Sequence, residues 1–250
     1  MRAPELSLVF PVFDEEDNIG PLLASAVALG RRLGKSFEII VVDDGSRDES
    51  ALRIAAARAL HPEITSVHHP SNRDYGAALR SGLRAARGAL VFFSDADLQF
   101  DLTELEALLA HTDSFDVVAG VRTPRRDPWG RRVLAFGWGT LVNALFDLSL
   151  RDIDCAFKLF RREVLDAIPI ASLGAFVNTE ILVRARAAGF HIRQVPVTHH
   201  PRRAGRPKGA TPRVIVRALV ELATLYGELR TASRSAVPES RALPARPSPP

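Results

Sequence analysis

Apolar residues occur along this chain in short runs that alternate with longer segments in which they recur at helical spacing. The short runs are rich in β-branched and aromatic residues, which is typical of strands. We expect strands near residues 6–12, 37–42, 64–68, 89–94, 115–120, 156–160 and 192–197. The periodic segments predict helices near residues 17–33, 47–60, 75–87, 102–111 and 179–188. This alternation predicts an α/β fold with a mostly parallel central sheet flanked by helices.

Acidic residues follow three of the predicted strands. The first strand leads into Asp14, and the second leads into Asp43 and Asp44. The fourth ends in SDAD, which places Asp95 and Asp97 on the same side of an extended chain. Because ligands bind beyond the carboxyl ends of strands in open parallel sheets, these acids could share one cleft. Helix N-capping would explain any one of them, but it explains three acidic strand ends poorly.

The SDADLQ segment has the composition of a divalent-cation site. Asp95 and Asp97 supply carboxylate oxygens and Gln99 supplies an amide oxygen. Mg2+ and Mn2+ favour oxygen ligands of this kind and keep positions open for substrate phosphates. The segment therefore indicates chemistry on a nucleotide diphosphate. A solvated acidic turn is the alternative when the segment is considered alone.

Composition fits one globular domain. The chain has 250 residues and a hydrophobic content of 46%, enough for one sizeable core. We expect a single domain over residues 1–230, with an amphipathic helix at 212–230 and a disordered Pro-rich tail over 231–250. The single Cys155 excludes an intrachain disulfide. No signal peptide and no apolar run of about 20 residues is visible, which favours a cytoplasmic protein.

The chain is basic, with a net charge of +4 and a pI near 9.8. All but three of its 33 basic residues are arginine, which suits bidentate phosphate binding. The arginines are dispersed and acids occupy the expected cleft, so we expect no nucleic-acid partner. A nucleotidyltransferase is also disfavoured, because residues 11–20 are acidic where such enzymes usually have a glycine-rich basic loop.

Four segments, in order along the chain, carry a resemblance to a known family. They are PVFDE at residues 11–15, VVDDGSRD at 41–48, SDADLQ at 94–99 and RDIDCAFKLFRR at 151–162. Together they resemble family 2 glycosyltransferases, and most closely the polyprenyl (dolichyl) phosphate sugar synthases. The resemblance implies a GT-A type, Rossmann-like fold, a nucleotide-sugar donor, a divalent Mg2+ or Mn2+ ion and inversion at the anomeric carbon.

The chain departs from the family pattern at two places. Phe13 and Asp14 replace the usual tyrosine and asparagine of the first segment. Cys155 and Ala156 replace a Ser-Gly pair in the segment on the acceptor side. The resemblance therefore defines the donor chemistry better than it defines the acceptor.

The resemblance also implies roles for individual residues. The metal ligands would be Asp95, Asp97 and Gln99, and the catalytic set would be Asp95, Asp97, Glu180, Arg122 and Arg131. The nucleotide-sugar-binding set would be Pro11, Phe13, Glu15, Asp43, Asp44, Asp95, Ala96, Arg122, Arg203 and Lys208. Arg203, Arg206 and Lys208 belong to a segment that resembles the HxxRxxGxSK phosphate loop of the family.

The role of Glu180 depends on the acceptor. A lipid phosphate, with a second pKa of about 6 as in phosphoserine, is already an anion near neutrality and needs no general base. A sugar hydroxyl acceptor would need one, and Glu180 is the candidate. An acid in the first turn of a helix is also favoured by the helix dipole alone, so a purely structural role stays open.

Two apolar segments are candidates for contact with a membrane surface. Residues 133–150 contain Trp138 and few charges, and residues 212–230 have apolar positions at helical spacing beside arginines. Such helices can lie in the membrane interface, which would indicate a lipid acceptor and a location on the inner face of the cell membrane. Ordinary core packing is the alternative for both segments.

These observations predict an inverting, metal-dependent glycosyltransferase. Its donor would be a nucleotide sugar of the GDP-mannose or UDP-glucose type, and its acceptor would be polyprenyl phosphate. Two alternatives stay open at this point. The first is a glycosyltransferase with a sugar hydroxyl acceptor, and the second is a catalytically degenerate protein that binds nucleotide sugars.

Overall fold

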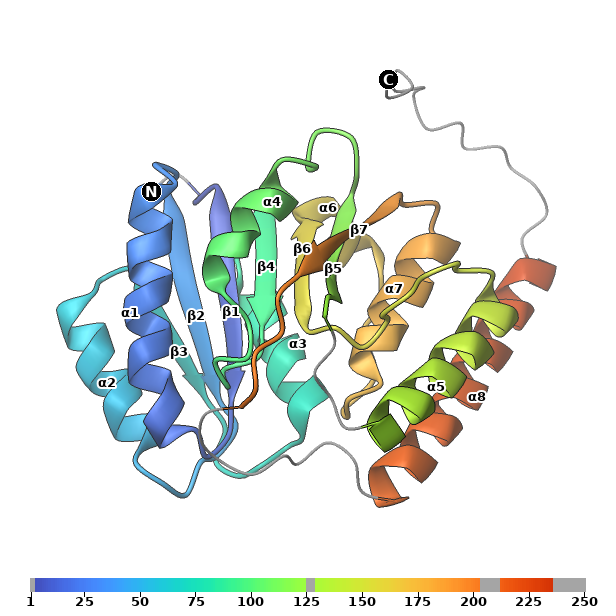
Figure 1. The fold of residues 1–250 in the computed structure, drawn as a ribbon, viewed down its shortest axis with the longest axis horizontal. Coiled ribbons are helices and arrows are strands. Elements are labelled where there is room, and N and C mark those ends of the chain that lie inside the picture. Colours follow the sequence, from blue (N-terminus) through green and yellow to red (C-terminus); the bar gives the residue numbers. More distant parts are fainter. Residues whose placement is uncertain (1–2, 125–128, 203–211, 236–250) are drawn as a thin grey trace.

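A seven-stranded sheet lies at the centre of the protein, with helices on both of its faces (Figure 1). The computed structural model describes residues 3–124, 129–202 and 212–235. The strand order is β3-β2-β1-β4-β6-β5-β7. The predicted α/β fold is confirmed; the predicted division into a domain over 1–230 and a disordered tail stays a prediction.

The observed elements lie close to those expected from the sequence. The strands are β1 (Leu6–Val12), β2 (Phe37–Asp43), β3 (Ile64–His68), β4 (Leu90–Ser94), β5 (Val117–Arg122), β6 (Phe157–Arg161) and β7 (Ile192–Val197). The helices are α1 (Glu16–Arg32), α2 (Ser50–Leu60), α3 (Tyr75–Ala85), η1 (Leu102–Glu104), α4 (Leu105–Leu109), α5 (Trp129–Phe146), α6 (Arg162–Ala167), α7 (Val177–Ala187) and α8 (Pro212–Ser235).

Six of the strands run in one direction and β6 runs against them. β1 pairs in parallel with β2 and β4, β2 with β3, and β5 with β7. β6 is antiparallel to both β4 and β5, so Ser94 at the end of β4 faces Phe157 at the start of β6. The turn before β6 therefore meets the carboxyl ends of the parallel strands, which is where ligands bind in open α/β sheets.

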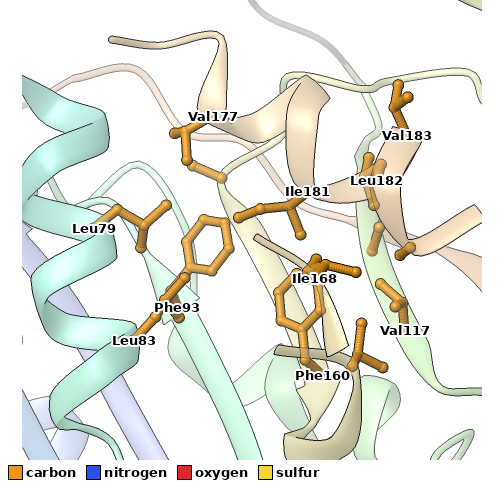
Figure 2. Close-up of a cluster of buried hydrophobic side chains, with 14 of the residues drawn as sticks. Leu79, Leu83, Phe93, Val117, Phe160, Ile168, Val177, Ile181, Leu182 and Val183 are labelled. Atoms are coloured by element: carbon orange, nitrogen blue, oxygen red, sulfur yellow. The ribbon is translucent and has the colours of Figure 1, made fainter. Parts of the chain in front are cut away.

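The two faces of the sheet each pack against a separate set of helices. Leu8 and Phe10 of β1 point into a core with α1 and α4, while Val9 between them points into a core with α3 and α7. Figure 2 shows the second core, in which the rings of Phe93 and Phe160 stack at a centroid distance of 5.9 Å. Both faces are covered, so the central strands β1, β2 and β4 read as nearly continuous apolar runs in the sequence.

The structure corrects one expectation about the helices and contains one helix that was not expected. The segment 102–111, expected as one helix, consists of the 3-10 turn η1 followed by the short α4. It begins where the side chain of Asp101 accepts a hydrogen bond of 2.9 Å from the backbone N–H of Thr103, which is the usual way to begin a helical turn. The sequence also did not indicate α6, whose six residues follow β6 directly and are too few for a helical period to show.

Candidate functional site

The polar residues predicted as functional gather at the carboxyl edge of the sheet. β1, β2 and β4 are neighbours and parallel, so the loops that follow them lie at the same edge. The loop after β1 carries Glu15, the loop after β2 carries Asp44, and the loop after β4 carries Asp95 and Asp97. The structure therefore confirms that three acidic strand ends share one edge.

The loops after β1 and β2 are linked to each other by their own acids. The carboxylate of Asp14 accepts a 2.8 Å hydrogen bond from the backbone N–H of Arg47, and the hydroxyl of Ser46 accepts one of 3.0 Å from the backbone N–H of Asp14. Asp43 is buried and accepts from the backbone N–H of Ser46 at 3.0 Å. Asp14 and Asp43 therefore hold the conformation of these two loops through hydrogen bonds to the backbone.

Asp44 lies at the end of a chain of buried hydrogen-bonding groups. Its Oδ1 oxygen is 2.6 Å from Nδ1 of His69 and accepts a 3.0 Å hydrogen bond from the backbone N–H of Arg73. Nε2 of the same histidine lies 2.9 Å from the hydroxyl of Ser81 in α3. Burial raises the pKa of Asp44, and the hydrogen bond from His69 opposes that rise. Because a carboxylate oxygen only accepts, His69 donates to Asp44 through Nδ1, and in the neutral ring Nε2 then accepts from the hydroxyl of Ser81.

Asp95 and Asp97 follow β4 in a tight turn. Asp97 is buried, and Asp95 is partly exposed but has a buried Oδ1 oxygen. Leu98 has a φ of 58°, in the left-handed region that a non-glycine residue rarely adopts. This geometry lets the backbone N–H of Gln99 donate to Asp97 at 3.2 Å. Strained backbone of this kind is often found at functional sites.

The electrostatics of this acid pair favour a bound cation. Burial and the neighbouring charge of Asp97 raise the pKa of Asp95 to about 7. Burial also raises the pKa of Asp97, against the opposing charge of Arg202. A divalent ion held by Asp95 and Asp97 would stabilise both carboxylates as anions.

The residues present fit a divalent cation. Within the described residues, the buried Oδ1 oxygen of Asp95 accepts no hydrogen bond of normal geometry, although the nearby hydroxyl of Tyr75 lowers the pKa of Asp95 against the effect of burial. A buried carboxylate oxygen without a partner is costly unless a ligand satisfies it. The described part of the chain contains no cluster of three or more His, Cys, Asp or Glu that could hold a metal alone. An ion here would thus take its remaining ligands from water and phosphate, as Mg2+ usually does.

Arg202 is the cationic residue that the structure brings to the acid pair. Its Nη1 lies 3.3 Å from Oδ2 of Asp97, and its Nη2 donates to Oε1 of Glu15. Gln99, predicted as a ligand, donates its amide N–H to the carbonyl of His200 at 2.9 Å and so ties the Arg202 segment to the β4 loop. The sequence prediction named the neighbouring Arg203, which lies outside the described residues and stays a prediction. The spacing of the HxxRxxGxSK pattern, counted from His199, points to Arg202.

Arg122 is held close to the site by Asp152. Its Nε and Nη2 nitrogens donate to the two carboxylate oxygens of Asp152 at 2.8 and 2.7 Å. This bidentate pair fixes the guanidinium at the end of β5, beside the turn that precedes β6. Its charge counteracts the rise in the pKa of Asp95. The predicted contact of Arg122 with phosphate stays a prediction.

Lys158, which the sequence did not indicate as a site residue, links several buried groups next to the site. The side chain is fully buried in β6, and its ammonium donates to the carbonyls of Ile153 and Cys155 and to the amide oxygen of Asn178. Burial lowers the pKa of Lys158. Burial also raises the pKa of Cys155 to about 12, which favours the protonated thiol near neutral pH.

Glu180 is fully engaged in structural hydrogen bonds. Only 2% of the residue is exposed, and its carboxylate accepts from the backbone N–H groups of Ala171 and Ser172 and from Nε of Arg184. These contacts favour a role in anchoring the 171–172 loop over the predicted role of a general base.

The other predicted site residues divide into two groups. Pro11 is buried in β1 beside Val42, Phe13 is half-buried just after it, and Ala96 is buried between the two acids. Arg203, Arg206 and Lys208 lie outside the described residues, as does the side chain of Arg131.

Comparisons with known proteins agree with this geometry. Residues 7–168 match the model of Glycosyl transferase family 2. The chain is 35% identical over 215 residues to the undecaprenyl-phosphate 4-deoxy-4-formamido-L-arabinose transferase of Pseudomonas fluorescens. This match covers 84% of the chain and 62% of that relative, so the chain spans less than two thirds of its length.

Two solved structures resemble the fold. A mycobacterial protein superposes with a TM-score of 0.70 at 28% identity, covering 90% of this chain and 75% of that one. Glucosyl-3-phosphoglycerate synthase from Mycobacterium tuberculosis, in complex with Mn2+, UDP-glucose and phosphoglyceric acid, superposes with a TM-score of 0.67 at 22% identity. That match covers 90% of this chain and 80% of that one. At this identity it shows the GT-A fold alone.

Proposed function

Because the chain belongs to Glycosyl transferase family 2, we propose that it transfers a sugar from a nucleotide-sugar donor to polyprenyl phosphate, with inversion at the anomeric carbon. The observation that carries this proposal is the acid pair Asp95 and Asp97 at the carboxyl end of β4, where the buried Oδ1 oxygen of Asp95 accepts no hydrogen bond of normal geometry within the described residues. The acceptor is proposed from the similarity to a relative named as an undecaprenyl-phosphate sugar transferase.

The charges at the edge suit the departure of a nucleoside diphosphate. We expect Asp95 and Asp97 to hold a Mg2+ or Mn2+ ion, which supplies charge stabilisation to the leaving group when bound. Arg202 contacts Asp97 directly. Its guanidinium would therefore lie close enough to bind the phosphate oxygens of the donor beside the metal site. Preorganised positive charge of this kind stabilises the charge that develops as the glycosidic bond breaks.

A lipid phosphate acceptor also agrees with the contacts of Glu180. The phosphate oxygen is an anion near neutrality, since its second pKa is about 6, so the reaction needs no general base. The carboxylate of Glu180 is occupied by Arg184 and by backbone N–H groups of the 171–172 loop. A sugar hydroxyl acceptor would require a general base, and these contacts leave the carboxylate of Glu180 poorly suited to that role.

We propose that Asp44 binds the nucleoside and that His69 holds it in place. Replacing His69 by Phe keeps the ring but removes the donor to Asp44, so we expect the Kd for the nucleoside diphosphate to rise about tenfold, or 1.4 kcal/mol. Isothermal titration with UDP and GDP measures this change. His191→Phe, at an exposed histidine before β7, is the control and should leave the Kd unchanged. An unchanged Kd in both variants would remove His69 from this role.

The helix pair α5 and α8 presents an apolar face to solvent. The two helices lie side by side at one end of the molecule (Figure 1), where Phe146 of α5 and Tyr226 of α8 pack at a centroid distance of 5.8 Å. Trp129 and Phe136, seven positions apart on α5, are 80% and 77% exposed. The exposed apolar residues of α8 are Ile215, Val216, Leu219 and Val220.

We propose that this face lies on the membrane that holds the lipid acceptor. None of the described helices is both long and apolar enough to cross a bilayer. An apolar helix face with exposed Trp and Phe suits the membrane interface, and the basic charge of the chain favours anionic lipid. Cytoplasmic synthesis at the inner face of the cell membrane is the location that we propose on this basis.

Removing the aromatic anchors should weaken membrane binding. Each exposed aromatic side chain contributes roughly 1.5–3 kcal/mol when it becomes buried, so Trp129→Ser with Phe136→Ser should lower the partition coefficient by at least about 100-fold. Flotation with vesicles of phosphatidylglycerol and phosphatidylethanolamine measures this effect. Leu52→Ser with Leu60→Ser, at the exposed apolar positions of α2, is the matched control. Equal losses in both double variants would contradict a specific membrane face.

The donor is tested with a panel of labelled nucleotide sugars. GDP-mannose, UDP-glucose and UDP-GlcNAc are each incubated with polyprenyl phosphate and Mg2+ or Mn2+, and label is counted in the organic phase. Transfer from one donor names the sugar and supports the proposal. Absence of transfer with all donors, together with tight binding of UDP or GDP, would indicate the degenerate binding protein instead.

A further inference from the structure

A cavity of about 270 Å³ lies between α3 and α6, away from the carboxyl edge. α3 contributes Arg80 and Arg84, which lie one turn apart on the same side of the helix. α6 contributes Arg162, and the segment 168–170 closes one side with apolar side chains. The cavity borders the end of β6, which runs against its neighbours, so it opens at the opposite end of the sheet from the acid pair.

The charge of this cavity is strongly positive. Three arginines line it, and Asp166 is the one carboxylate among its lining residues. Asp166 is largely exposed and pairs with Arg162 at 3.6 Å. Among the described residues, Arg80 and Arg84 have no carboxylate partner within ion-pair distance. Unpaired guanidinium groups that converge on a cavity form a typical anion-binding arrangement.

Most of the N–H donors of these arginines are not used within the described part of the chain. Arg80 donates through Nη1 alone, to the carbonyls of Ile170 and Ala171 at 3.4 and 3.2 Å. Arg162 donates through its terminal nitrogens to the carbonyls of Leu83 and Ala86. These backbone contacts hold both side chains in place, and each guanidinium has five N–H groups in total. The remaining donors of Arg80 and Arg162 are therefore available to an anion in the cavity.

We propose that this cavity binds a small phosphomonoester. Its volume is slightly below the range of about 300–1,000 Å³ that is common for small-molecule sites, so the ligand has only a few carbon atoms. The arginines match a phosphate dianion, and Leu83, Leu165 and Ile168 provide apolar contacts for the carbon skeleton. The site is separate from the glycosyl-transfer site, and its occupation does not depend on the proposed function.

The test measures binding of glycerol 3-phosphate and inorganic phosphate by isothermal titration, at constant ionic strength and in the presence of EDTA. EDTA removes divalent ions, so the acids of the carboxyl edge repel phosphate. We expect saturable binding of one equivalent, with glycerol 3-phosphate binding more tightly than inorganic phosphate. Arg84→Gln, at an exposed side chain, should weaken binding at least tenfold.

Matched variants distinguish this cavity from other basic positions. Arg80→Gln should weaken binding to a similar degree, whereas Arg53→Gln, at an exposed arginine of α2 that pairs with Glu49, should have no effect. A melting temperature equal to that of the wild type confirms that Arg84→Gln is folded. Absence of saturable binding, or binding that is the same in the wild type and in Arg84→Gln, would overturn the proposal.

Discussion

Replacing Asp97 by Asn is expected to lower kcat/KM for sugar transfer by about 10²–10³-fold, while the protein stays folded. The variant keeps the shape of the side chain and its hydrogen bond with Gln99, but it removes one of the two charges that we expect to hold the metal. Asn is a weaker ligand for a hard cation, and the charge of the leaving diphosphate is then less well stabilised.

Transfer of label from the donor measures this loss, and circular dichroism confirms the fold. Asp113→Asn, at an exposed acid after α4, is the control and should keep full activity. An Asp97→Asn enzyme with wild-type activity would remove the acid pair from the mechanism. The activity of the variant is measured well below its melting temperature, so that unfolding does not contribute to the loss of activity.

Replacing Glu180 by Ala is expected to lower the free energy of unfolding by about 3 kcal/mol. The change leaves the backbone N–H groups of Ala171 and Ser172 without their acceptor, and it removes the buried partner of Arg184. Chemical denaturation measures the effect. Glu228→Gln, at the half-exposed second partner of Arg184, is the control and should cost less than about 1 kcal/mol.

Glu180→Gln separates the structural role of this residue from catalysis. The amide oxygen of Gln can still accept from the loop, so the variant should fold and retain kcat within about tenfold of the wild type. A folded Glu180→Gln enzyme that loses activity by about 10³-fold or more would instead support a general base and a hydroxyl acceptor. The same variant therefore distinguishes the two acceptor classes.

The sequence predicted the fold well because the relevant signals are local. Apolar runs place the strands within a few residues of their observed bounds, and the acids at the ends of β1, β2 and β4 follow those runs directly. A parallel sheet then brings their ends together without further information. The reversed direction of β6 was not predicted, since the pairing partners of a strand are not encoded in its own pattern.

The side-chain network of the site was predicted less completely because it joins residues that are far apart in the chain. His69 contacts both Asp44 in the β2 loop and Ser81 in α3, and no local spacing indicates such a connection. Lys158 stands out in the sequence only as a lysine within an apolar strand. For Arg202 a signal did exist, in the spacing from His199, but the neighbouring Arg203 fits the same basic segment.

The partition of labelled sugar between lipid and water tests the central proposal most directly. The protein is incubated with vesicles that contain polyprenyl phosphate, with the labelled donor that the panel identifies and with Mn2+, and the organic and aqueous phases are then counted. We predict label in the organic phase that disappears with EDTA and in Asp97→Asn. If all of the label released from the donor is found in the aqueous phase, on a soluble sugar or as free sugar, this result would contradict the proposed transfer to a lipid phosphate.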